Sequence, residues 1–190
     1  MNRILRTASG IVTVLAIQSL WIAGLVAQQS PKATALAAVE RNSEEIAKVG
    51  DAIFGFAELG MQEFETARLC GELLSEMGYV VETGISGIPT AILASYGTGR
   101  PVIAIHVEYD AVPNGSQVPG VTGREEVVAG APGHAEGHNT NAAVWIGAAF
   151  AIKEAIDAHE LTGTIKLFSA PAEEQIISRP YFVRTAISMM

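Results

Sequence analysis

Basic residues and cysteine are both scarce in this sequence. Its 190 residues include 12 Lys and Arg against 20 Asp and Glu, which gives a formal net charge of −8. The basic residues form no cluster, and a nucleic-acid-binding surface needs a basic patch, so we expect no nucleic-acid partner. The single cysteine, Cys70, excludes an internal disulfide. Because Cys70 falls within a helical pattern, it is predicted to be an ordinary small core residue.

The sequence also lacks internal repeats and low-complexity tracts, and its apolar content is high enough for a folded core. Hydrophobic residues make up 49% of the chain and charged residues 17%, a balance that excludes disorder as the default state. The length fits one domain of ordinary size. Several acids lie in apolar surroundings, where a carboxylate needs a partner, and metal ions are one kind of partner.

The N-terminus has the order of a secretory signal peptide. Arg3 and Arg6 give a positive start, and residues 11–27 form an uncharged, mostly apolar run that ends in small residues. The run is shorter than the roughly 20 residues that a spanning helix needs. We therefore expect a signal peptide over residues 1–27 and export to the periplasm or the extracellular space, with a membrane anchor as the alternative. Residues 28–35 are polar and small and predict a linker.

After the linker, helical and extended patterns follow one another along the chain. Strands that alternate with helices predict an α/β fold, a layered sheet with helices on both faces. The nearly continuous apolar run at 102–107 predicts a central strand covered on both faces. Residues 114–133 are rich in Gly, Pro and polar residues and predict a long loop, which in a compact domain is usually functional or mobile. The expected helices span 36–59, 63–77 and 139–158, and the expected strands span 79–83, 89–96, 102–107 and 164–170.

Acids and histidines recur where predicted strands and loops end. Ligands of open α/β sheets bind outside the carboxyl ends of the strands, so we expect these groups to gather at one edge of the sheet. They are Glu108 and Asp110 after the strand at 102–107, His134, Glu136 and His138 in a loop that runs into a helix, and Glu173 and Glu174 after the strand at 164–170.

Carboxylates and imidazoles in such a set are the groups that metal-assisted hydrolysis needs. Two metal ions roughly 3.5–4 Å apart lower the pKa of a shared water and polarise a carbonyl, and His and carboxylate ligands suit zinc, manganese or cobalt. Adjacent acids such as Glu173 and Glu174 can divide the work, one binding metal and the other moving the water's proton to the leaving amine. Taken singly, an acid after a strand is more often a turn or cap residue, and a loop histidine is usually just solvated.

Four segments follow one another along the chain: Glu58-Leu-Gly60 with Glu63 and Glu65-Thr66, then Glu108-Tyr-Asp110-Ala-Val-Pro113, Gly133-His134-Ala-Glu136-Gly-His138-Asn139, and Pro171-Ala-Glu173-Glu174. In this order they resemble the dinuclear-metal amidohydrolases and metallopeptidases of the aminoacylase and carboxypeptidase group. The similarity is greatest to the branch of p-aminobenzoyl-glutamate hydrolases and N-acyl-amino-acid amidohydrolases, and it covers about residues 43–187.

The resemblance implies a catalytic domain like that of the zinc exopeptidases and two catalytic residues. Glu173 would be the general base and acid, and Asp110 would orient the metal site. The implied reaction is hydrolysis of the amide bond of an N-acyl- or aroyl-amino acid or a small peptide, a small-molecule substrate. The implied cofactors are two divalent metal ions: zinc, manganese or cobalt.

The resemblance also implies the metal ligands. His138 and Glu174 match ligand positions, and Glu136 stands at the bridging position, where relatives commonly have Cys or Asp. Glu108 stands where relatives have His or Asp, and on that ground alone it is an expected ligand. His134 matches a frequent family position to which we assign no role.

Comparison with the family further predicts what this chain lacks. Family members carry another ligand histidine after the acid pair, an inserted lid domain that often forms a homodimer, and a final ligand histidine near the end. No histidine follows His159, so residues 36–190 are expected to be the N-terminal part of the catalytic domain, with an open sheet edge. Two hypotheses result: a metal-dependent amidohydrolase acting on C–N bonds, or a truncated, inactive remnant or binding subunit that requires a second chain to supply the missing half.

Overall fold

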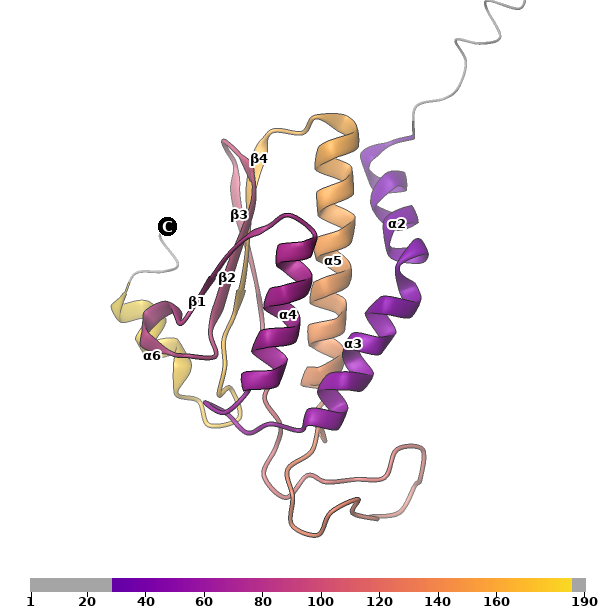
Figure 1. The fold of residues 1–190 in the computed structure, drawn as a ribbon, viewed down its shortest axis with the longest axis vertical. Helices are drawn as coiled ribbons and strands as arrows, with labels where there is room; N and C mark the ends of the chain where they lie inside the picture. The colour runs from indigo at the N-terminus through magenta and orange to yellow at the C-terminus, as the bar shows by residue number, and fades with distance from the viewer. Residues whose placement is uncertain (1–28, 186–190) are drawn as a thin grey trace, which may run out of the picture. The chain divides into compact units, whose positions relative to one another are not determined.

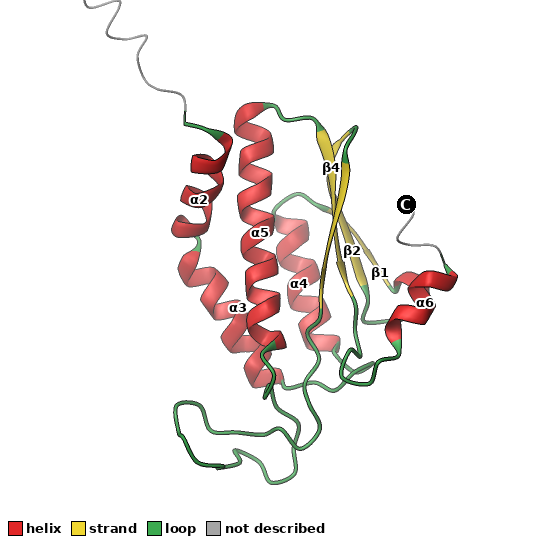
Figure 2. Cartoon of the chain, turned by 180° about the vertical axis from the view of Figure 1, so that it is seen from behind, coloured by secondary structure: helices red, strands yellow, loops and turns green. Residues whose placement is uncertain are grey.

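A mixed α/β fold is seen in the computed structural model, which describes residues 29–185. One four-stranded sheet has the order β1-β2-β4-β3. Helices α2 to α5 lie on one side of the sheet and α6 on the other, as expected for a layered fold (Figures 1 and 2). The strands are β1 (Val80–Thr83), β2 (Ile92–Thr98), β3 (Val102–Val107) and β4 (Gly163–Ser169), and the helices are α2 (Pro31–Arg41), α3 (Ser43–Phe56), α4 (Phe64–Glu76), η1 (Ile85–Gly87), α5 (His138–His159) and α6 (Ser178–Arg184).

The unit β3-α5-β4 decides where the predicted site residues lie. Strands β3 and β4 are parallel neighbours, whereas β4 pairs with β2, and β2 with β1, in antiparallel fashion. A parallel pair needs a crossover connection, and α5 provides it. Because α5 runs back along the sheet, its N-terminal end lies beside the carboxyl ends of β3 and β4 (Figure 1). Three segments that are distant in sequence therefore meet at this edge.

The main core fills the space between the sheet and helices α3, α4 and α5. Leu167 of β4, Ile146 of α5 and Leu74 of α4 are fully buried in it. Cys70 lies in the same cluster at 0% exposure, and burial raises the pKa of its thiol to about 12. The prediction that Cys70 is a core residue is confirmed.

Two predictions about individual segments are wrong. Strand β3 lies at the edge of the sheet, with Val102 48% and Ile103 49% exposed. The faces of a strand are covered by the helices packed on them, and the first residues of β3, at the edge of the sheet beside β4 alone among the described strands, lack that cover. The linker predicted for 28–35 is also too long, since α2 begins at Pro31. Proline is preorganised for the first position of a helix, and the alanines after it favour helical structure.

The N-terminal predictions concern a part of the chain that is not described. The expected signal peptide at 1–27 lies outside the described residues, so export and the alternative of a membrane anchor stay predictions. Within residues 29–185, no helix combines the length and the apolar character that crossing a bilayer requires.

Candidate metal centre

Three of the predicted metal ligands come together at the edge where β3 and β4 end. One side-chain ligand atom from each of Glu136, His138 and Glu174 lies within 4.8 Å of the other two. His138 is the first residue of α5, Glu136 precedes it in the loop, and Glu174 follows β4. One imidazole nitrogen and two carboxylate oxygens form a donor set that suits zinc, manganese or cobalt.

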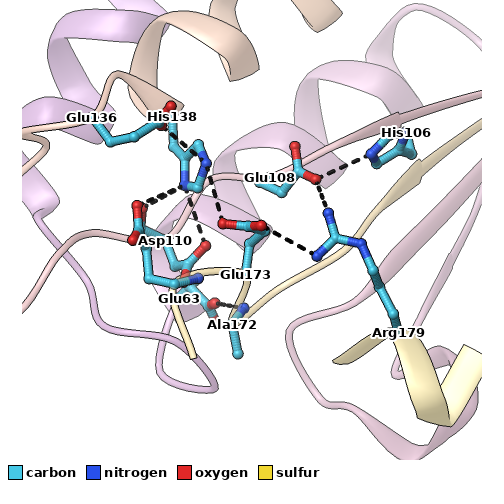
Figure 3. Close-up of polar contacts among 10 residues, drawn as sticks. Glu63, His106, Glu108, Asp110, Glu136, His138, Ala172, Glu173 and Arg179 are labelled. Atoms are coloured by element: carbon cyan, nitrogen blue, oxygen red, sulfur yellow. Dashed lines mark hydrogen bonds and ion pairs between the residues drawn. The ribbon is translucent and has the colours of Figure 1, made fainter. Parts of the chain in front are cut away.

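Asp110 lies beside this group and contacts two of its members, His138 (Figure 3) and Glu174. Nδ1 of His138 donates a hydrogen bond of 3.0 Å to the Asp110 carbonyl oxygen and lies 3.4 Å from its Oδ1. The backbone N–H of Glu174 donates to Asp110 Oδ2 at 3.0 Å. With its proton on Nδ1, the imidazole has Nε2 available for a metal. Contacts like those of Asp110, made behind the ligand atoms, orient the ligands of metal sites.

The electrostatics of the group favour a bound cation. Nε2 of His138 lies 3.0 Å from Glu136 Oε2. Burial alone would lower the pKa of His138, but its contacts with Asp110 and the charge of Glu136 outweigh burial and raise the pKa to about 9. Burial raises the pKa of Glu174. Glu174 Oε1 and Asp110 Oδ1 are buried and accept no hydrogen bond from the described residues. A divalent cation would compensate for such unmatched oxygens, so the donor set fits one.

Glu173 adjoins the three ligands without being one of them. Its Oε2 lies 3.9 Å from His138 Nε2, and its side chain is 33% exposed. Water can therefore reach the Glu173 carboxylate beside the ligand group. A carboxylate at this position can exchange protons with a water molecule next to the group.

Glu108 contacts a different set of residues. Its Oε1 accepts a hydrogen bond from Nη2 of Arg179 and lies 3.1 Å from Nε2 of His106 (Figure 3). Arg179 also reaches Glu173 Oε1, at 3.4 Å. The structure therefore brings Glu108 to a guanidinium group and not into the three-ligand group. Sequence reasoning missed Arg179, which lies in the short helix α6, where no local pattern marks it.

His134 is likewise not one of the three grouped ligands. Its ring lies beside that of Phe54, with centroids 6.5 Å apart. Both ring nitrogens are buried, and burial lowers the pKa of His134 against the opposing effect of the Ile53 backbone. The side chain borders a cavity of about 420 Å³ formed with the loop around residues 114–121.

The loop between α3 and α4 supports the turn that carries the acid pair. A Cβ atom added at Gly60 would lie 2.6 Å from Cα and 2.7 Å from Cβ of Ala172. Only glycine permits so close an approach of the two backbones. The same loop contacts the Asp110 segment, because Leu59 forms an isolated bridge with Ala111. One loop therefore touches both acid-bearing segments.

We expect Gly60→Ala to destabilise the chain by about 1–3 kcal/mol, because the new methyl group would force the Ala172 turn to move. Gly55→Ala is the matched control, since a Cβ there meets nothing within 4 Å. Its helical position makes alanine neutral or favourable, by up to about 1 kcal/mol. Urea unfolding followed by circular dichroism measures both changes. Equal midpoints for the two variants would contradict the close contact at Gly60.

The relatives among curated proteins include, by name, hydrolases, carboxypeptidases and a deacetylase. One subunit of the p-aminobenzoyl-glutamate hydrolase of Escherichia coli (strain K12) is 31% identical over 150 residues, which cover 79% of this chain and 31% of that protein. The N-acetyl-L-cysteine deacetylase of Bacillus subtilis (strain 168) is 33% identical over 123 residues, 63% of this chain and 27% of that protein. The matched part thus spans between a quarter and a third of the length of these curated relatives. No protein-family model matches it.

Solved structures give the same relationship. The Bacillus subtilis YXEP protein, described as a dinuclear metal binding peptidase from the M20 family, has a TM-score of 0.64 and 25% identity, over 80% of this chain and 40% of that one. An aminobenzoyl-glutamate utilization protein from Klebsiella pneumoniae matches in fold, with a TM-score of 0.54 and 19% identity, over 73% of this chain and 39% of that one. By sequence and by fold, the chain is similar to metal-dependent amidohydrolases and to a peptidase of the M20 family, over part of their length.

Proposed function

We propose that this chain serves in the metal-dependent hydrolysis of the amide bond of an N-acyl- or aroyl-amino acid or a small peptide. One observation carries the proposal: Glu173 stands beside three grouped metal-ligand side chains, with its Oε2 3.9 Å from the imidazole of His138. The relatives support the reaction class, since their names describe hydrolases and a deacetylase of such compounds.

Each residue of the site has a defined task in this proposal. Glu136, His138 and Glu174 would hold a divalent cation, which when bound lowers the pKa of a water and polarises the scissile carbonyl. Glu173 takes the proton of the attacking water and passes it to the leaving nitrogen. Asp110 keeps the imidazole of His138 in the orientation that ligation needs. The dinuclear relative supports a second ion, which Glu136 would share with the first.

The exposed edge of the sheet favours a second candidate function, that of one subunit of a two-chain hydrolase. Strand β3 leaves its apolar residues Val102 and Ile103 half-exposed and has no strand beyond it among the described residues. A free edge of this kind accepts another strand. The Escherichia coli relative is itself named a hydrolase subunit. In this candidate, a second chain docks at β3 and supplies further ligands to the metal centre.

Metal binding and turnover by the purified chain test both candidates. We expect at least about one equivalent of zinc to remain after dialysis, because three side chains offer ligand atoms and the site is partly buried. Metal analysis measures the zinc content. Release of free amino acid from N-acetyl- and N-benzoyl-amino acids measures turnover. Binding of much less than one equivalent would overturn the metal site. A metal-loaded chain that hydrolyses nothing until a second chain is added would favour the subunit role.

A further inference from the structure

Glu63 is a fully buried carboxyl group outside the candidate ligand group. It directly precedes α4 and is 0% exposed. Its Oε1 accepts a hydrogen bond of 2.8 Å from the backbone N–H of Ala172 (Figure 3). Its Oε2 accepts one of 2.8 Å from the Thr90 hydroxyl. Burial raises its pKa. Since burying a carboxyl group has a high free-energy cost, these two hydrogen bonds are what makes the placement tolerable.

The hydrogen bond to Ala172 holds the turn from which the acid pair projects. Ala172 has a φ of 58°, in the left-handed region that a residue with a Cβ seldom adopts. It directly precedes Glu173. One residue further along, the backbone N–H of Glu174 is held by Asp110 Oδ2. The backbone of the acid pair is thus fixed on both sides of Glu173, by Glu63 before it and by Asp110 after it.

Thr90 extends this network to the other acid-bearing segment. Its hydroxyl donates to Glu63, and its carbonyl oxygen accepts a hydrogen bond from the hydroxyl of Tyr109, the residue before Asp110. The Tyr109 hydroxyl also lies 2.9 Å from Oγ of Ser169, at the end of β4. These contacts are buried. Glu63 therefore belongs to a network that reaches the segments of both Asp110 and Glu174.

We propose that Glu63 is a positioning residue of the metal centre: through the Ala172 N–H it sets the backbone that aims Glu173 and Glu174. The inference rests on the proposed function, because it gives Glu63 a task only if the centre binds metal. Metal sites need ligands held within about 0.5 Å of the productive geometry. Groups that hold ligands without touching the ion typically alter metal affinity by about 10–100-fold.

Two substitutions at Glu63 separate positioning from simple stability. Glu63→Gln keeps both contacts, since the amide oxygen can accept from Ala172 and the amide nitrogen can donate to the Thr90 hydroxyl. Glu63→Ala removes both. We expect zinc affinity to fall about 10–100-fold in Glu63→Ala and to stay near that of the wild type in Glu63→Gln. Isothermal titration with zinc is run at a temperature where circular dichroism shows each variant folded.

Leu74→Ala supplies a control matched for lost stability. Leu74 is fully buried in α4, away from the turn, so its truncation destabilises the core by about 2–5 kcal/mol and leaves zinc affinity unchanged. Equal zinc affinity in wild type and Glu63→Ala would overturn the positioning role. Absence of zinc binding in the wild type would instead overturn the proposed function. If Glu63→Ala fails to fold, Thr90→Val replaces it: weaker zinc binding supports the inference, and unchanged binding overturns it.

Discussion

Replacing Glu173 by Gln is expected to lower the rate of amide hydrolysis about 10²–10⁴-fold while leaving the amount of bound metal unchanged. The amide has the shape of the carboxylate but cannot accept the proton of the attacking water. Glu173 lies beside the three ligands and is not one of them, so the metal should remain. The kcat at saturating substrate and metal analysis of the same sample, with the partner chain present if turnover requires one, give the two readouts.

An exposed acid in α4 is the control for this substitution. Glu72 forms an ion pair with Arg68 on the surface, and its side chain is 58% exposed. Glu72→Gln should therefore leave both turnover and metal content as they are in the wild type. Turnover that survives in Glu173→Gln would rule out the base assignment. Loss of metal from that variant would instead make Glu173 a ligand.

The elements around the site could be predicted from the sequence because their patterns are local. The helix expected at 139–158 is α5 (His138–His159), and the strand expected at 164–170 is β4 (Gly163–Ser169). Once these two and β3 are recognised as a βαβ unit, the meeting of His138 with Glu174 at one edge follows from topology. The exposure of β3 did not follow, because an apolar run of residues does not show which neighbours the strand will have.

The residues that support the site were harder to predict, because their roles depend on contacts between distant segments. Glu63 precedes a helix, where an acid normally faces solvent, and its bond to Ala172 joins residues 109 positions apart. Arg179 pairs with Glu108 across 71 positions. The resemblance included Glu63 in its first segment, and that was the one signal pointing to it. The pairing with Arg179 left Glu108, which was expected to be a ligand, outside the group.

We expect His138→Ala to weaken zinc binding by at least about 100-fold, more than the loss of a contact outside the ligand group would. His138 provides the one nitrogen of the grouped ligands, and its removal leaves two carboxylates for the ion. The variant also deprives Asp110 of the imidazole that lies against both its carbonyl and its carboxylate. Some loss of stability is therefore expected, and thermal unfolding without metal measures it separately.

His159→Ala is the matched control, because it removes an imidazole from the other end of the same helix. His159 is the last residue of α5, and its Nε2 lies 2.8 Å from the Thr34 hydroxyl, so its loss should affect only the contact with α2. Competition with a zinc-chelating dye measures the zinc affinity of the wild type, His138→Ala and His159→Ala. Equal affinity of His138→Ala and His159→Ala would mean that α5 contributes no ligand. The zinc would then have to be held by acids alone, and a site of that kind would prefer harder cations such as magnesium or manganese.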